Sequence, residues 1–172
     1  MANKPTKKNL KSKNIRSVDK ERKIKRPRNK WNVKQKEAIS LYVYSMAKIM
    51  KLQDWKIKVK WDKFCDEFDD AYATNTPVGD SRHCEIRFSE RFLELDDQEM
   101  TQAVVHELLH CYYFPVEDYT EEMFTKATDE KSAELFSIGH TKLMETAIDG
   151  IADGIANVVP NFKLPDRNKL KK

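Results

Sequence analysis

Long apolar runs are missing from this sequence of 172 residues. No stretch approaches the roughly 18 apolar residues that a helix needs to cross a bilayer. The basic residues near the start are not followed by an apolar segment, so they do not form a secretory signal. Cysteine is also scarce, with only Cys65, Cys84 and Cys111, and an odd number of thiols argues against a disulfide framework. These absences predict a protein of the reducing cell interior that does not enter a membrane.

Charge is divided unequally along the chain. Residues 1–30 hold thirteen Lys or Arg and two acidic residues, a net charge of +11, whereas the remainder holds 19 basic and 26 acidic residues, a net charge of −7. A block of like charge with few apolar residues cannot bury enough surface to fold alone. We therefore predict a basic, disordered tail at residues 1–31, an acidic domain at residues 32–160 and a short basic tail at residues 161–172.

The N-terminal tail lacks aromatic residues before Trp31, which argues against stacking on bases and against sequence-specific reading of nucleic acid. Its cations can still contact phosphates without sequence preference, because each contact releases counterions. The candidate residues for such contacts are Lys20, Arg22, Lys23, Lys25, Arg26 and Arg28. Docking on an acidic partner and a simple contribution to solubility are the alternatives.

Hydrophobic periodicity predicts an α+β domain. Over residues 33–51 and just beyond, residues recur at spacings of three and four, which indicates an amphipathic helix. The recurring positions are Ala38, Leu41, Tyr42, Ser45, Ile49 and Leu52. Alternating patterns predict three short strands, at residues 55–61, 71–74 and 82–89.

Two longer helices are expected in the C-terminal half. Asp96 and Glu99 form a capping box ahead of an apolar periodic run. Pro115 disfavours helical geometry at the preceding residue, so this helix is predicted at residues 97–113. The second is predicted at residues 128–158, with or without a break near Gly139. The expected buried stripe of the second helix, at four-residue spacing, is Leu143, Ala147, Ile151 and Ile155.

The first of these helices contains the sequence His106-Glu107-Leu108-Leu109-His110, an HExxH pattern. Two histidines four residues apart on a helix project from the same face. They can ligate one Zn²⁺ ion and leave positions for a third ligand and a water molecule. Glu107 adjoins the first histidine and can act as general base on that water.

A third ligand is needed, because two histidines alone make a poor catalytic metal site. No histidine follows His110 at the short spacing that metzincins use. The candidates on the last predicted helix are His140, Glu145, Asp149 and Asp153. We favour Glu145 as the ligand, with Asp149 one turn later accepting a hydrogen bond from a ligand histidine and so orienting it. His140 is the main competitor.

An HExxH motif followed tens of residues later by Glu-x-x-x-Asp resembles the gluzincin branch of the zincin metallopeptidases. The compact order of elements is similar to the small bacterial and phage zincins of the ImmA/IrrE kind. The resemblance implies a minimal zincin-like fold with an N-terminal helix, a three-stranded sheet, the motif helix and a second long helix. It also implies zinc held by His106, His110 and Glu145, with Glu107 activating water and Asp149 supporting a ligand. The extended second subdomain of the large peptidases is missing.

The function implied by this resemblance is zinc-dependent hydrolysis of peptide bonds in a specific intracellular protein. In such a fold an extended substrate pairs with the strand beside the motif helix, and residues 82–89 are the expected edge strand, with an internal position as the alternative. Candidate donors to the oxyanion of the transition state are Tyr112, Tyr113, Tyr119 and His140. The competing function is a zincin scaffold without proteolytic activity that binds nucleic acid or protein through its basic tail.

Overall fold

The computed structural model describes residues 31–62, 71–78 and 81–167. The basic N-terminal tail and its candidate phosphate contacts lie outside these residues. The described chain forms, in order, α1 (Val33–Ile49), β1 (Lys56–Trp61), β2 (Ala73–Val78), β3 (His83–Phe88), the short 3₁₀ helix η1 (Glu90–Glu94), α2 (Asp97–Ala127) and α3 (Glu130–Ala156). This is the α+β order that the sequence predicts.

The sheet has the strand order β1-β3-β2. β3 pairs in parallel with β1 and antiparallel with β2. The prediction that residues 82–89 form the edge is therefore wrong, because this strand is bonded on both sides. Its side chains Cys84, Ile86 and Phe88 are fully buried, as expected of a central strand. β2 is an edge strand instead, and an edge tolerates Pro77, which has no N–H to donate to a ladder.

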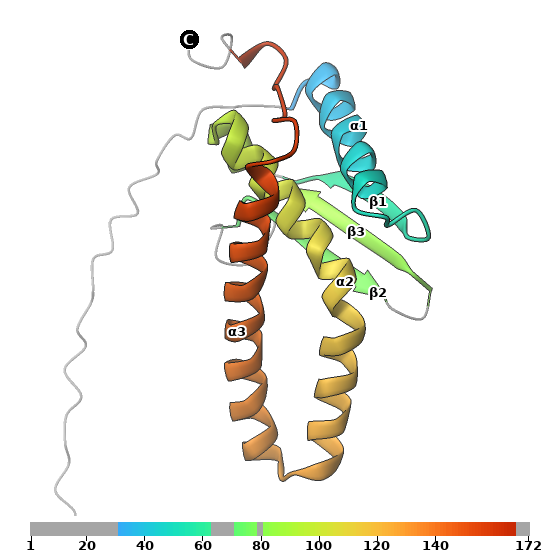
Figure 1. Cartoon of the computed structure of the whole chain (residues 1–172), viewed down its shortest axis with the longest axis vertical. Helices are drawn as coiled ribbons and strands as arrows, with labels where there is room; N and C mark the ends of the chain where they lie inside the picture. Colours follow the sequence, from blue (N-terminus) through green and yellow to red (C-terminus); the bar gives the residue numbers. More distant parts are fainter. Residues whose placement is uncertain (1–30, 63–70, 79–80, 168–172) are drawn as a thin grey trace, which may run out of the picture.

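One face of the sheet is covered by helices and the other is charged. α1 and α2 lie over the apolar face, where Ile86 and Phe88 join Val104 and Leu108 of α2 in the core (Figure 1). On the opposite face Glu85 forms ion pairs with Lys60 of β1 and with Arg87 of its own strand, both at 2.7 Å. The domain is therefore a two-layer α+β structure with one core.

The buried face of α1 agrees only in part with the expected one. Of the predicted row, Ala38, Tyr42 and Leu52 meet the core, but Leu41 and Ile49 are 68% and 54% exposed. The fully buried residues of the helix include Ile39, Val43 and Met46, which the prediction did not name. Apolar residues occur on several sides of α1, and nothing local distinguishes the side that meets the sheet.

α2 does not end before Pro115. It begins at the predicted capping box of Asp96 and Glu99 but continues to Ala127. A proline inside a helix removes one backbone hydrogen bond and costs about 3 kcal/mol. Packing against α3 offsets this cost, since Phe124 stacks on Phe136 with ring centroids 3.3 Å apart. The prediction of a helix ending at residue 113 is wrong because tertiary packing outweighs the local signal.

α3 runs without a break at Gly139, and its buried stripe is rotated by one residue from the predicted one. Leu143 is 73% exposed and Ile151 is 39% exposed, whereas Ile148, Ala152 and Ala156 are buried. The buried row includes two alanines, whose small side chains let α3 approach α2 closely. The sequence prediction favoured the row with the larger apolar residues. Because the structure buries the neighbouring row instead, the predicted buried stripe is wrong.

A matched pair of substitutions on α3 tests this register. Replacing Ile148, which is fully buried, with Ala should lower the free energy of unfolding by about 2–5 kcal/mol, because the core cannot collapse around the lost atoms. Leu143→Ala should change it by less than about 0.5 kcal/mol. Urea denaturation of the full chain gives both values. A larger loss for Leu143→Ala than for Ile148→Ala would show that the predicted stripe was right.

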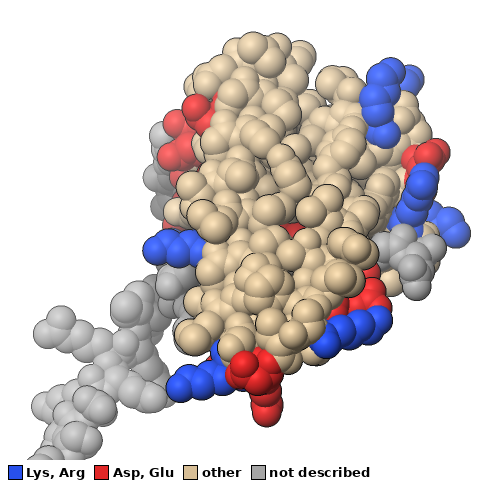
Figure 2. All heavy atoms as spheres, turned by 60° about the horizontal axis from the view of Figure 1, so that its bottom comes forward, with Lys and Arg blue, Asp and Glu red and all other residues tan. Residues whose placement is uncertain are grey.

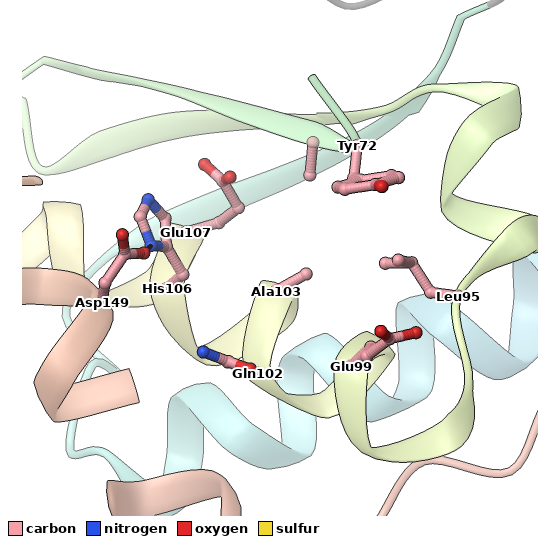
Figure 3. Close-up of a pocket in the computed structure, with 9 residues that line it drawn as sticks. Tyr72, Leu95, Glu99, Gln102, Ala103, His106, Glu107 and Asp149 are labelled. Atoms are coloured by element: carbon pink, nitrogen blue, oxygen red, sulfur yellow. Dashed lines mark hydrogen bonds and ion pairs between the residues drawn. The ribbon is translucent and has the colours of Figure 1, made fainter. Parts of the chain in front are cut away.

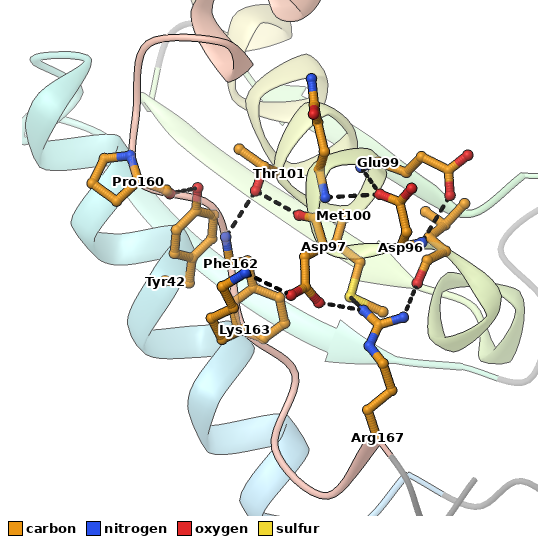
Figure 4. A network of polar contacts seen from close by, with 12 residues as sticks. Tyr42, Asp96, Asp97, Glu99, Met100, Thr101, Pro160, Phe162, Lys163 and Arg167 are labelled. Carbon is orange, nitrogen blue, oxygen red and sulfur yellow. Dashed lines mark hydrogen bonds and ion pairs between the residues drawn. The ribbon is translucent and has the colours of Figure 1, made fainter. Parts of the chain in front are cut away.

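The segment after α3 packs back onto the start of α2. Phe162 and Leu164 are buried in the core, and the Phe162 N–H donates a 2.8 Å hydrogen bond to Thr101 Oγ1. Arg167 donates to the carboxylate of Asp97 at 2.7 Å (Figure 4). Residues 161–167, which the sequence assigned to a C-terminal tail, thus hold the first turns of α2 in place.

α2 and α3 extend past the sheet as a long helical hairpin (Figure 1). In a view that brings the tip of this hairpin forward, charged side chains lie mostly around the outline and uncharged residues fill most of the centre (Figure 2). Large apolar side chains on the hairpin are exposed, namely Val116, Tyr119, Met123, Leu135 and Ile138. None of the described helices combines the length and apolar character that crossing a membrane requires.

Candidate metal centre

Three potential metal ligands converge where α2 and α3 lie side by side. His106 Nε2 lies 3.2 Å from His110 Nε2 and 3.3 Å from Glu145 Oε2. Glu145 Oε1 lies 3.7 Å from His110 Nε2. Within the described part of the chain, these three residues are the one His/Cys/Asp/Glu group whose ligand atoms all lie within 4.8 Å of one another. They can together hold a metal ion.

The local structure explains how the three side chains meet. His106 and His110 are one helical turn apart, so both rings leave the same face of α2. The rotated register of α3 buries Ile148 and turns Glu145 and Asp149 toward that face. The histidine side chains are only 19% and 16% exposed, so both are largely buried between the two helices.

Asp149 fixes the orientation of His106. Its Oδ1 lies 2.9 Å from His106 Nδ1, at the distance of a charge-assisted hydrogen bond. When Nδ1 donates to this carboxylate, the lone pair of a neutral imidazole is on Nε2, which is the atom that faces His110 and Glu145. The carboxylate–histidine arrangement is the one that supports metal-binding histidines in proteins.

The surroundings shift the pKa values of the two histidines in opposite directions. Burial lowers the pKa of His106, but the hydrogen bond to Glu145 and the charges of Glu107, Glu145 and Asp149 outweigh it and raise that pKa above its usual value. Burial lowers the pKa of His110. The hydrogen bond from His106 lowers the pKa of Glu145. The negative charge of Glu145 thus lies beside both histidines, where a divalent cation can also be held.

Glu107 is a buried carboxyl group beside the ligands. It is 6% exposed, and burial raises its pKa to about 7. Its Oε2 has no hydrogen-bond partner in the structure. A buried carboxylate without a partner is costly, and such a group with a pKa near neutrality can accept or release a proton at the site.

The edge strand β2 is tied to the motif helix by Asn75, a residue that the sequence reasoning missed. Asn75 Nδ2 donates a 2.6 Å hydrogen bond to the backbone oxygen of Glu107 and approaches Cys111 Sγ at 3.4 Å. Cys111 is itself buried and faces the sheet, away from the ligands. No local sequence signal marks Asn75, since its role depends on a contact 32 residues away.

Two cavities adjoin the candidate ligands along β2. The first, of about 400 Å³, is lined by residues that include Tyr72, Ala103, His106 and Glu107, and Figure 3 shows the Glu107 carboxylate projecting into the space between α2 and the strand. The second, of about 290 Å³, is lined by residues that include Asn75, His110 and Glu145. The ligands thus lie between two hollows rather than on a flat surface.

The other site residues predicted from the sequence differ in whether they reach the two cavities. His140 lines the second cavity with His110 and Glu145 and stacks on Phe136 with ring centroids 5.3 Å apart, but it is outside the ligand group. Tyr112 and Tyr119 are 46% and 63% exposed and line neither cavity. Of the proposed oxyanion donors, His140 alone is brought to the wall of a site cavity.

No protein-family model, no curated protein and no solved structure matches this chain. The metal centre therefore rests on its own residues and on their geometry.

Proposed function

We propose that this protein is a zinc-dependent peptidase whose metal is held by His106, His110 and Glu145. The observation that carries the proposal is the spacing of the three ligand atoms, 3.2, 3.3 and 3.7 Å. Tetrahedral zinc with bonds of about 2.0–2.2 Å needs ligand atoms about 3.3–3.6 Å apart. Three protein ligands also leave a fourth position open, as in catalytic rather than structural zinc sites.

The open position and Glu107 together suit hydrolysis. A zinc ion at this site would polarise a substrate carbonyl and lower the pKa of a coordinated water molecule. Glu107 is not among the ligand group but adjoins it, and its Oε2 has no partner. It can take a proton from the attacking water and deliver it to the leaving amine. His106 is held in the ligating tautomer by Asp149.

The edge of β2 is suited to an extended substrate. The Ser89 N–H donates to the Tyr72 carbonyl. In an antiparallel pair, residues whose backbone N–H and C=O face the partner strand alternate with residues whose groups face away. The backbone groups of Tyr72, Thr74 and Thr76 therefore face β3. The backbone groups of Ala73 and Asn75 point to the other side of β2, where none of the described strands pairs with it. A peptide chain that adds to this side would pass the metal ligands and both cavities. This transfers to β2 the role that the sequence assigned to residues 82–89.

Removal and return of the metal test the proposal. The full chain should cleave one or more proteins in an extract of intracellular proteins, with new termini found by mass spectrometry. A chelator should abolish cleavage, and zinc added after the chelator is removed should restore it, because Glu107 cannot act without a polarised water. Zinc binding without any cleavage would contradict the peptidase proposal and favour a binding protein on the same scaffold.

A further inference from the structure

The cavity between the hairpin helices has an acidic wall that the proposed reaction does not use. Glu117, Asp118 and Glu121 of α2 line it, opposite His140 and Thr141 of α3. Its volume is about 290 Å³, and its inner end is formed by the candidate ligands His110 and Glu145. The acidic wall thus belongs to the metal cleft and is not an isolated surface cluster.

Within the described part of the chain, no Lys or Arg side chain lines this cavity. Glu117 interacts electrostatically with His140, and Glu121 accepts a 3.1 Å hydrogen bond from the neutral Ser137 hydroxyl. Glu122, on the adjoining side of the same helix, does form an ion pair with Lys126. The contrast is informative, because like charges gathered in a hollow repel one another unless a cation from elsewhere enters.

The cavity offers both parts of a site for a long cationic side chain. Phe114 and Pro77 supply apolar surface near its walls, against which the methylene stem of Lys or Arg can lie. The three carboxylates supply acceptors for the charged head. A divalent ion is a poorer match, because such a cation would be bound in preference by the nearby His106, His110 and Glu145.

We propose that this cavity binds a Lys or Arg side chain of the substrate, on the N-terminal side of the bond that is cleaved. The inference rests on the proposed peptidase function. β2 runs from the first cavity, at Ala73, to the second, at Pro77. Antiparallel pairing is the more stable arrangement per residue, so we place the substrate strand antiparallel to β2. It then enters through the acidic cavity and leaves past Glu107, and the residues before the cleaved bond occupy the acidic cavity. The buried Glu107, whose Oε2 has no hydrogen-bond partner among the described residues, lines the first cavity on the other side of the cleavage point.

Binding can be tested apart from cleavage. The full chain carrying Glu107→Gln and loaded with zinc is titrated with two fluorescent extended peptides, identical except for Lys or its neutral isostere norleucine. We expect about 10- to 100-fold tighter binding of the lysine peptide, as for a charged hydrogen bond. Adding Glu117→Gln and Glu121→Gln should remove the preference, whereas Glu122→Gln, which is paired outside the cavity, should keep it.

The outcomes separate the two proposals. Equal affinity for both peptides, or a preference unchanged by the double substitution, would overturn the basic-residue site. If the double variant fails to fold, the affinities of the lysine and norleucine peptides for the Glu107→Gln chain, with and without Glu122→Gln, still decide whether the site prefers a basic residue. Selective binding with no cleavage by the unmodified chain would support the acidic site but contradict the peptidase function. Cleavage without enrichment of Lys or Arg before the cleaved bond would support the peptidase function but contradict the basic-residue site.

Discussion

Glu107→Gln should lower the rate of peptide cleavage by about 10²- to 10⁴-fold, the usual contribution of a positioned general base. The amide has nearly the same shape as the carboxylate and fits the same buried space, where the native group is 6% exposed. It cannot accept the proton of the attacking water. Because Glu107 is not in the ligand group, the variant should bind zinc as well as the unmodified chain does. Initial rates at equal zinc occupancy give the comparison.

A Glu→Gln control on the same helix makes this result specific. Glu122 is exposed and pairs with Lys126, so Glu122→Gln should leave the rate unchanged. Cleavage by Glu107→Gln at the unmodified rate would remove the general base from the mechanism. Loss of zinc from that variant would instead mean that Glu107 supports the metal, contrary to its assigned role.

The second large effect is expected at the ligands. His106→Ala and His110→Ala should each abolish stoichiometric zinc binding, because two ligands remain of a site built from three. Glu145→Ala should weaken binding strongly for the same reason. Asp149→Asn should cost about 10- to 100-fold in affinity, since the amide orients His106 less well. Competition titration with a chromophoric chelator measures these affinities in the full chain.

His140→Ala is the matched control for the ligand set. His140 lines the cavity of His110 and Glu145 but lies outside the ligand group, so its removal should leave zinc affinity nearly unchanged. The opposite pattern, with full affinity in Glu145→Ala and loss in His140→Ala, would make His140 the third ligand and refute the assignment of Glu145.

Much of this site could be predicted from the sequence because its signals are local. The histidine spacing places His106 and His110 on one face of a helix, and the capping box at Asp96 marks where that helix begins. The four-residue spacing of Glu145 and Asp149 puts both carboxylates on one side of α3, where they reach His106 at 3.3 and 2.9 Å. These relations depend on helical geometry, which the sequence pattern expresses directly.

The features that escaped prediction depend on contacts between distant elements. The length of α2 beyond Pro115 depends on packing against α3, and the buried row of α3 depends on how closely the two helices approach. The sequence left the central position of β3 as the alternative to an edge, because the parallel pairing with β1 that decides it has no turn signal. Asn75 is joined to Glu107 across 32 residues. These contacts join residues far apart in the chain, so no local pattern in a single sequence predicts them.

A crystal structure of the full chain grown with zinc would test the central claim most directly. We predict one zinc ion about 2.0–2.2 Å from Nε2 of both His106 and His110 and from the Glu145 carboxylate, with the hydrogen bond from His106 to Asp149 retained and Glu107 unligated. Zinc bound by other residues, with these three side chains turned away from one another, would contradict the account.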